Sequence, residues 1–484
     1  MPQLETDYLV IGAGTAGLAF ADALVAESDA RVVIVDRRGQ PGGHWTDAYP
    51  FVRLHQPSAF YGVNSLDLGR ARKDDSGPNA GLYELASGPE VCSYFDRVLR
   101  ERLLPSGRVE WRPMTEVMAD GRLRNLLSGE ITELKVRRRV VDAAYGGPSI
   151  PSTHIPKFGV APGVRLVPPN ALAGLAHAKG SGPDGVPTRF VILGAGKTAM
   201  DTGVWLLQSG ARPEDIQWVV PRDSWLIHRL TTQPGLEFFE HSIGGQADQM
   251  QAFAEATSVD DLFLRLEAAG SVMRIHRDRL PTMFHLATIS PGEVEQLRRI
   301  EQVIRLGRVR RIETDRLVLE EGDVPMQPGT LFIDCTASAV EPRPSQPIFQ
   351  EGRIVLQIVR LPQPAFSAAL IGWVEAHHQD DAVKNGLCRT VPFPYTMADY
   401  PASMMANLSN QAAWGRDPGL RAWMRTSRLD GFGPMLAQID PQDSGRLAIL
   451  GRLKALAGPA MENLARLAAQ AKRNPAAAAG GTGA

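Results

Sequence analysis

The sequence predicts an α/β fold with two Rossmann-like, doubly wound domains, the second inserted in the first, followed by a helical C-terminal region. The main observation is a succession of apolar strand, glycine-rich turn and alanine-rich helix around Gly12, which returns around Gly194. Strands that feed helices through such turns build parallel sheets covered by helices. The second observation is length: 484 residues exceed the roughly 250–300 at which single hydrophobic cores stop growing.

The first glycine-rich turn has the spacing of a dinucleotide-binding loop. Gly12 permits a tight turn, Gly14 lets the backbone approach a pyrophosphate, and Gly17 lets the helix pack close to the strand. Thr15 and Ala16 lie at the start of the helix, where free N–H groups and the positive end of the helix dipole attract phosphate. The turn is therefore predicted to hold the pyrophosphate of a dinucleotide.

The strand after this helix ends at an acidic residue. Asp36 closes the apolar segment 31–35, at the distance from the glycines where a carboxylate accepts the ribose hydroxyls. We assign FAD to this first site because it is N-terminal and because the glycine-containing segment 39–45 follows it. Arg37, Val117 and Ala144 are expected to add contacts to FAD.

The second turn keeps the pattern with one substitution. Gly194 and Gly196 occupy the first two glycine positions, and Ala199 stands at the third, where only a small side chain is needed. Lys197 and Thr198 complete the turn, and the lysine is expected to add a positive contact. The turn predicts a second dinucleotide site.

An arginine stands where this second site would read the ribose. The apolar strand 217–220 is followed by Pro221 and Arg222, so that an arginine precedes Asp223. A guanidinium grips phosphate in a bidentate fork, which suits the 2′-phosphate of NADPH. NADPH is therefore favoured, Asp223 leaves NADH open, and the alternative for Arg222 is a surface charge.

A segment between the two turns resembles a known family signature. Gly42-Gly43-His44-Trp45, followed by Tyr49-Pro50 and Arg53, is similar to the GGxW…YPGxR signature of the class B flavin monooxygenases, which include the flavin-containing and the Baeyer–Villiger monooxygenases. In that family this loop runs beside the flavin. The resemblance implies that Gly43, His44, Trp45 and Arg53 contact FAD, and the alternative for Trp45 is an ordinary core aromatic.

The resemblance spans residues 8–225 and becomes thinner at its linkers. Residues 142–151 are similar to the linker motif ATGxxSxP, and residues 333–337 are expected to form the matching second crossover. The fingerprint FxGxxxHxxxW/Y is not readable, since the segment that begins at Phe158 lacks the histidine. The subclass therefore stays open.

Candidate catalytic residues follow from the same resemblance. His55 stands where the Baeyer–Villiger pattern has an aspartate, which makes ordinary ketone oxygenation less expected. His55, Gln56 and Asn64 would lie near the flavin and offer hydrogen bonds there, or only support the loop.

These motifs divide the chain into six parts. They are an FAD-binding domain, first part (1–150), a linker (151–187), an NADPH-binding domain with a helical insertion (188–325), an FAD-binding domain, second part (326–414), a helical C-terminal region (415–473) and a disordered tail (474–484).

Composition and charge exclude several other classes. The formal net charge of −1 offers no field for nucleic acid. The three cysteines form no CxxC pair, and no metal is expected at His377-His378-Gln379-Asp380-Asp381, because adjacent histidines point apart. The sequence has no apolar stretch long enough to predict a membrane span, so we expect a cytoplasmic location. A homodimer stays open.

The resemblance implies an FAD-dependent, NADPH-using monooxygenase. Its reaction on a small organic molecule with O2 would be heteroatom oxidation, N-hydroxylation, Baeyer–Villiger insertion or hydroxylation. Two alternatives remain: an FAD-dependent NAD(P)H oxidoreductase that passes electrons to another acceptor, and a flavin-binding protein without turnover. The substrate is not readable from the sequence.

Overall fold

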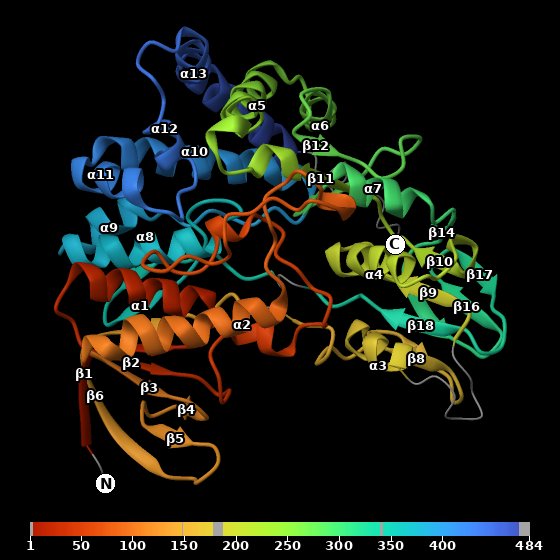
Figure 1. The fold of residues 1–484 in the computed structure, drawn as a ribbon, viewed down its shortest axis with the longest axis horizontal. Coiled ribbons are helices and arrows are strands. Elements are labelled where there is room, and N and C mark those ends of the chain that lie inside the picture. Colours follow the sequence, from red (N-terminus) through yellow and green to blue (C-terminus); the bar gives the residue numbers. More distant parts are fainter. Residues whose placement is uncertain (1–2, 148, 178–186, 339–341, 474–484) are drawn as a thin grey trace.

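The computed structural model describes residues 3–147, 149–177, 187–338 and 342–473. Two α/β units lie side by side, and helices from the middle and the end of the chain run along one side of them (Figure 1). The expected disordered tail 474–484, residues 178–186 of the expected linker and residue 148 of the expected linker motif lie outside the described residues.

The first unit is a sheet with the strand order β19-β20-β6-β1-β2-β3. From β20 to β3 all neighbouring strands are parallel. Numbered from the glycine loop, this is the order 5-4-1-2-3 of a doubly wound sheet. The strands are β1 (Gln3–Ile11), β2 (Val32–Val35), β3 (Val109–Arg112), β6 (Ile131–Asp142), β19 (Phe349–Gln350) and β20 (Arg353–Val355).

Close helix packing covers this first sheet. Helix α1 (Thr15–Glu27) packs on α8 (Pro364–His377), where a Cβ on Gly372 would lie 2.7 Å from the carbonyl oxygen of Phe20. A glycine is thus needed at the helix contact. Helix α2 (Gly88–Arg97) covers the same unit, and Ser87 begins it with a capping box.

In the second unit the four strands around the glycine loop have the same order, but the fifth strand, β8, comes from before the loop. Its sheet runs β14-β10-β9-β18-β8, and all its neighbouring strands are parallel. The strands are β8 (Arg165–Val167), β9 (Phe190–Leu193), β10 (Ile216–Val219), β14 (Gln302–Ile304) and β18 (Leu331–Asp334). The second sheet therefore extends beyond the expected limits of 188 and 325: β8 comes from the expected linker, and β18 from the expected return to the first domain.

Matched crossovers join the two sheets. After β6, the N–H of Ala143 donates to the carbonyl of Ile11 at 3.1 Å; after β18, the N–H of Cys335 donates to the carbonyl of Leu193 at 3.0 Å. The chain then returns to β19 and β20 of the first sheet. The prediction that the second domain is inserted in the first, with 333–337 as the matching crossover, is confirmed.

The remaining elements surround these sheets. A three-stranded sheet contains β11 (Ser224–His228), β12 (Val272–Met273) and β13 (Met283–Ile289), and a four-stranded one β7 (Gly159–Val160), β15 (Val309–Ile312), β16 (Arg316–Leu319) and β17 (Gly322–Pro325). Strands β4 (Thr115–Val117) and β5 (Leu123–Asn125) extend the first sheet. Between α2 and α8 the chain forms five further α-helices within the described residues: α3 (Leu172–His177), α4 (Lys197–Gln208), α5 (Gly245–Glu255), α6 (Val259–Ala268) and α7 (Pro291–Arg298).

The C-terminal region is helical, as expected. The expected region 415–473 contains α11 (Pro418–Thr426), α12 (Gly433–Leu436) and the long α13 (Ser444–Arg473), and it is preceded by α9 (Asp381–Leu387) and α10 (Tyr400–Arg416). Leu464 and Leu467 of α13 join a core cluster with Phe253 of α5 and Phe263 of α6. Within the described part of the chain, none of the helices has the length and apolar character needed to cross a membrane.

Candidate functional site: two glycine loops and the charged groups between them

The first glycine loop forms a tight turn between β1 and α1. Gly12 has a φ of 106°, a conformation that residues with a side chain rarely adopt. A Cβ on Gly17 would lie 1.9 Å from the carbonyl oxygen of Gly12, so only glycine lets the helix begin this close to the strand. The prediction for these two positions agrees with the geometry.

The N-terminus of α1 is left without a side-chain cap. Its N-cap is Gly14, which makes no side-chain hydrogen bond, whereas α2, α6, α7, α9 and α11 each begin at a serine or aspartate that accepts a backbone N–H. Free N–H groups at a helix N-terminus, together with the dipole, form an anion-binding site. The loop therefore has the donor set that a pyrophosphate requires.

Asp36 lies directly behind this loop. The side chain is buried, its Oδ2 accepts the N–H of Ala13 at 2.7 Å, and its Oδ1 accepts the N–H of Arg38 at 2.8 Å. Each carboxylate oxygen has a second lone pair, so the geometry leaves acceptor capacity for ribose hydroxyls.

The segment that resembles the family signature folds against the glycine loop. The N–H of Gly42 donates to the carbonyl of Ala13 at 2.9 Å, and a Cβ on Gly43 would lie 2.9 Å from the Cα of Gly14. Gly42 and Gly43 have φ values of 125° and 58°. Two glycines are thus needed for the chain to pass this close to the loop.

A tyrosine that the sequence did not indicate connects Trp45 to the glycine loop. The Tyr61 hydroxyl accepts the indole N–H of Trp45 at 2.6 Å and shares a hydrogen bond of 2.5 Å with the hydroxyl of Thr15. Burial raises the pKa of Tyr61 to about 12, so the hydroxyl keeps its proton at neutral pH. Burial, reinforced by Arg38, lowers the pKa of His44 to about 4, and that imidazole is neutral.

Other expected FAD contacts lie in different surroundings. Arg37 is exposed, 3.8 Å from Glu116. Arg53 donates to the carbonyl of Leu85 at 3.2 Å, so its guanidinium turns towards the segment before α2. Val117, in β4, packs with a core cluster that includes Leu9 and Val33. Ala16 packs against the core of the first unit, and Ala144 is exposed after β6, where its N–H donates to Asp142 at 3.0 Å.

The three candidate catalytic side chains are not brought together. The main-chain oxygen of His55 accepts a hydrogen bond from Arg229 at 3.3 Å. Gln56 donates to the carbonyl of Pro362 at 3.4 Å, and the Asn64 side chain accepts the hydroxyl of Ser427 at 2.9 Å. Asn64 therefore anchors the C-terminal region, and His55 alone of the three lies beside charged groups from the second unit.

Those charged groups form a buried interdomain cluster of Lys197, Asp201, Arg229 and Glu293. Their side chains are at most 12% exposed. Lys197 pairs with Asp201 and lies 3.5 Å from Glu293, which also pairs with Arg229. From the first unit, the hydroxyl of Tyr49 donates to Asp201 at 2.8 Å. Lys197, expected as a contact for the dinucleotide, is instead committed to this cluster.

The cluster controls the protonation of its members. Burial alone would raise the pKa of Glu293, but Lys197 and Arg229 lower it to about 2. Burial would lower the pKa of Lys197, but Asp201 and Glu293 raise it. Burial, reinforced by Lys197 and Arg229, lowers the pKa of His55 to about 3. Burial raises the pKa of Asp201, although Lys197 opposes this shift. At neutral pH Glu293 is therefore ionised and the imidazole of His55 is neutral.

The second glycine loop has the same geometry as the first. Gly194 has a φ of 109°, and a Cβ there would lie 2.8 Å from the carbonyl oxygen of Cys335. Gly196 is the N-cap of α4 and makes no side-chain hydrogen bond. Ala199 is fully buried, as expected for a small third residue, and Thr198 lies between them in the first turn of α4.

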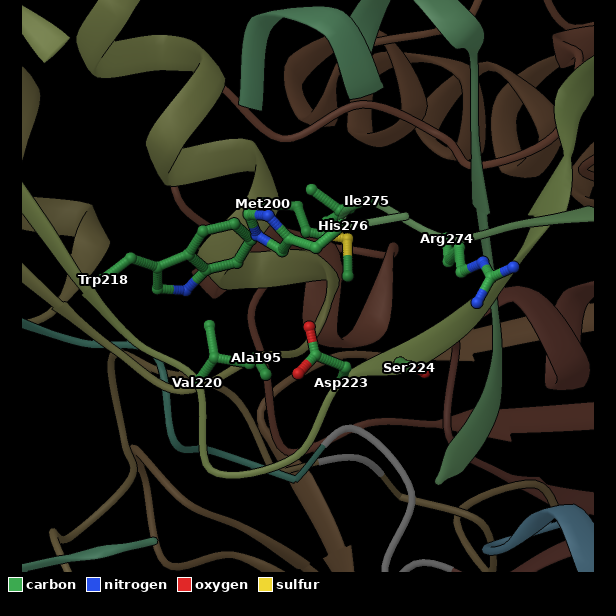
Figure 2. Close-up of a pocket in the computed structure, with 9 residues that line it drawn as sticks. All are labelled: Ala195, Met200, Trp218, Val220, Asp223, Ser224, Arg274, Ile275 and His276. Atoms are coloured by element: carbon green, nitrogen blue, oxygen red, sulfur yellow. The ribbon is translucent and has the colours of Figure 1, made fainter. Parts of the chain in front are cut away.

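A pocket opens beside this loop. It is lined by the loop residue Ala195, by Met200 of α4, by the end of β10 and by residues 274–276. Figure 2 shows Trp218, Met200 and His276 close together, with Asp223 and Ala195 across from them. Among the described residues, the buried Nε2 of His276 has no hydrogen-bond partner. The pocket thus offers an aromatic wall and an unpaired imidazole nitrogen next to the second loop.

The two sites differ where the ribose would be read. The N–H of Gly12 donates to Val35 and that of Gly194 to Val219, which makes Val220 the counterpart of Asp36. No carboxylate stands at this position of the second site. The hydroxyl of Ser224, the next polar residue after Asp223, donates to the carbonyl of Met283 at 3.3 Å.

The adjacent histidines of the C-terminal region have other partners. His377 stacks on Trp373 with ring centroids 4.1 Å apart and lies 3.5 Å from Glu27. His378 lies 3.4 Å from Asp417.

A family model matches the part of the chain that contains the first glycine loop. Residues 10–65 match the family described as an NAD(P)-binding Rossmann-like domain. The ferredoxin–NADP reductase of Salinispora tropica is 35% identical over 92 residues, which cover 19% of this chain and 28% of that protein.

Solved structures with a related arrangement have low sequence identity. Cyclohexanone monooxygenase with ε-caprolactone bound is 13% identical, with a TM-score of 0.49 over 78% of this chain and 87% of that chain. The polycyclic ketone monooxygenase of the fungus Thermothelomyces thermophila is 13% identical, with a TM-score of 0.49 over 96% and 89%.

Two mycobacterial relatives match nearly the whole chain. The uncharacterized protein Rv2000 of Mycobacterium tuberculosis is 46% identical over 464 residues, which cover 96% of this chain and 84% of that protein. An uncharacterized protein of Mycobacterium bovis, Mb2023, matches equally over the same lengths. The chain belongs to the same protein family as these two mycobacterial proteins.

Proposed function

We propose that the chain is an FAD-dependent, NADPH-using monooxygenase that oxygenates a small organic molecule with O2. The observation that carries this proposal is the pairing of two glycine loops of one geometry in two parallel sheets whose four central strands have the same order. Asp36 lies behind the first loop. At the second loop Val220 occupies the equivalent position, and Arg222 follows it in the sequence. One chain would thus hold two dinucleotides that differ at the ribose.

The residues around the first loop fit FAD. The uncapped start of α1 would bind the pyrophosphate, and Asp36 would accept the adenosine ribose hydroxyls. The close approach of Gly43 to Gly14 supports a contact between the signature segment and the cofactor. Trp45 is held in place by Tyr61, which supports a positioning role for that indole.

The residues around the second loop fit NADPH better than NADH. The start of α4 would bind the pyrophosphate. With Val220 in place of an acid, Arg222 is the first charged residue after the strand and would contact a 2′-phosphate. The name of the partial relative, ferredoxin–NADP reductase, agrees with this choice of cofactor.

When bound, FAD supplies the redox chemistry, and the chain's own residues bind, orient and exclude water. His55 lies between the units as a neutral imidazole, able to accept or donate one hydrogen bond there. The interdomain cluster holds the two units in register through the Tyr49–Asp201 hydrogen bond. The reacting groups of the two cofactors would meet between the units.

The test is an anaerobic reduction followed by oxygenation. Full-length protein loaded with FAD is mixed with NADPH in the absence of oxygen, and the visible flavin band should bleach. Isotopically labelled O2 is then admitted together with an amine, a sulfide or a ketone. One labelled oxygen atom should appear in the product of at least one substrate class.

Three outcomes would contradict this proposal. Bleaching followed by hydrogen peroxide as the sole product with every class excludes a monooxygenase. Rapid electron transfer to a quinone or ferredoxin, without labelled product, supports a reductase instead. Retention of FAD without bleaching by NADPH indicates a flavin-binding protein without turnover.

A further inference from the structure

The edge of the second sheet where β10 and β14 end carries an excess of arginine. The N–H of Val220 donates to the carbonyl of Ile304 at 2.9 Å, so the residues that follow the two strands lie side by side. Arg222 and Asp223 follow β10, while Arg305 and Arg308 follow β14. This edge adjoins the pocket of the second glycine loop, because Asp223 also lines that pocket (Figure 2).

The only acid among these four residues is already bound. Arg305 grips Asp223 in a fork, with Nε–Oδ2 and Nη2–Oδ1 distances of 2.8 and 3.0 Å. The main-chain oxygen of Asp223 accepts the N–H groups of Thr282 and Met283 at 3.1 and 3.2 Å, which fixes the segment. A carboxylate held in this way repels a phosphate less and is a weaker acceptor for a ribose hydroxyl.

The other two arginines share one nearby acid, Glu320, which already pairs with Arg310. Within residues 187–338 and the other described ranges, neither Arg222 nor Arg308 takes part in a salt bridge. The nearby Glu320 is engaged by Arg310 at 3.2 Å and by the N–H of Arg308 at 2.9 Å. Burial, reinforced by Arg308, lowers the pKa of Arg222. Glu320 offsets only part of the repulsion between the two guanidiniums, and an anion bound between them would relieve the rest.

We propose that Arg305 and Arg308 make the second site selective for an adenosine nucleotide with a 2′-phosphate: Arg308 joins Arg222 on that phosphate, and Arg305 withholds Asp223. This inference rests on the proposed function, which assigns a nicotinamide dinucleotide to the second loop. It deepens that assignment, since cofactor choice depends on Arg305 and Arg308, which lie more than 100 positions beyond the second glycine motif at 194–199.

The test measures binding, without electron transfer. Adenosine 2′,5′-bisphosphate and adenosine 5′-monophosphate are titrated into the full-length protein by calorimetry. Arg308→Ala should weaken the bisphosphate about tenfold or more and change the monophosphate by less than about twofold, because charge-assisted hydrogen bonds contribute about 1.5–3 kcal/mol each. Arg316→Ala, which removes an exposed arginine paired with Glu313 in β16, is the control and should change neither affinity.

The fork is tested by a variant and its rescue. Arg305→Ala frees the charge of Asp223 and should lower the preference for the bisphosphate over the monophosphate about tenfold. The double variant Arg305→Ala/Asp223→Asn removes the freed charge and should regain most of the bisphosphate affinity. Near-native far-ultraviolet circular dichroism of each variant shows that the change is not unfolding.

The outcomes separate this inference from the proposed function. Equal weakening of both nucleotides by Arg308→Ala, or no rescue in the double variant, would overturn the inference. If the wild type binds neither nucleotide, the second-site assignment fails and the inference with it. If selectivity changes as expected but no oxygenated product forms, the inference stands and the monooxygenase proposal fails.

Discussion

The Gly14→Ala variant is expected to fold as the wild type does and to lose most of its affinity for FAD. Gly14 has a φ of −82° and a ψ of −173°, which alanine adopts without strain. The nearest atom to an added Cβ is the Cα of Gly43 at 3.5 Å, an ordinary van der Waals distance. The free energy of unfolding of the apoprotein should therefore change by less than about 1 kcal/mol.

The methyl group acts on the cofactor instead. It would stand where a pyrophosphate oxygen must approach the N–H groups at the start of α1. Loss of two charge-assisted hydrogen bonds costs about 3 kcal/mol or more, which weakens FAD binding at least about 100-fold.

The assay for this variant compares FAD content and folding. FAD per chain is read from the visible absorbance after dialysis, and stability from denaturant unfolding of the apoprotein. Gly415→Ala is the matched control: its Cβ meets nothing within 4 Å, in α10, and it should keep its FAD. A Gly14→Ala protein that retains as much FAD as the wild type would refute the assignment of the pyrophosphate to this loop.

Three further predictions concern stability. Gly17→Ala should lower the free energy of unfolding by at least about 3 kcal/mol, since its Cβ would lie 1.9 Å from the Gly12 oxygen; an unfolding midpoint equal to that of the wild type contradicts this. The folded pKa values of His44 and His55, about 4 and about 3, lie below the unfolded value of 6.5, so the unfolded apoprotein binds more protons as pH falls below 6.5. At pH 5 each of these two histidines should lower the free energy of unfolding by about 2 kcal/mol. His55→Gln should remove about half of this pH dependence in denaturant titrations, and an unchanged pH dependence contradicts the buried, neutral state. Glu293→Gln leaves the buried guanidinium of Arg229 without its carboxylate partner and should destabilise the protein by about 3–5 kcal/mol, whereas a loss below about 1 kcal/mol would mean that the cluster is open to solvent.

Local spacing was sufficient to predict the two glycine loops, and the family resemblance was needed to predict the crossover at 333–337. The roles of Gly12, Gly17 and Gly194 follow from steric rules that act within a few residues, and the structure reproduces them. The signature segment after the first loop was also recognisable, because Gly42 and Gly43 have backbone conformations that require glycine.

Long-range pairing was not readable in the same way. Strands β8 and β18 have only 3 and 4 residues, and their sheet is decided by tertiary hydrogen bonds. Lys197 and Asp201 are four residues apart on a helix, a spacing that could have indicated their ion pair. Arg229 and Glu293, by contrast, reach Lys197 only through the fold, so that the lysine was assigned to the dinucleotide.

The interaction of Asp223 illustrates the same limit. Its place after β10 left NADH open, and only the fold brings Arg305 onto both carboxylate oxygens. The residue type alone could not show that an arginine binds this carboxylate.

Anaerobic titration of the full-length, FAD-loaded protein with NADPH tests the central claim most directly. We predict one FAD per chain, full bleaching of the visible flavin band by one equivalent of NADPH, and slower bleaching by NADH. A chain that binds no FAD, or a flavin band that neither nucleotide changes, would contradict the assignment of the two glycine loops to a flavin and a nicotinamide dinucleotide.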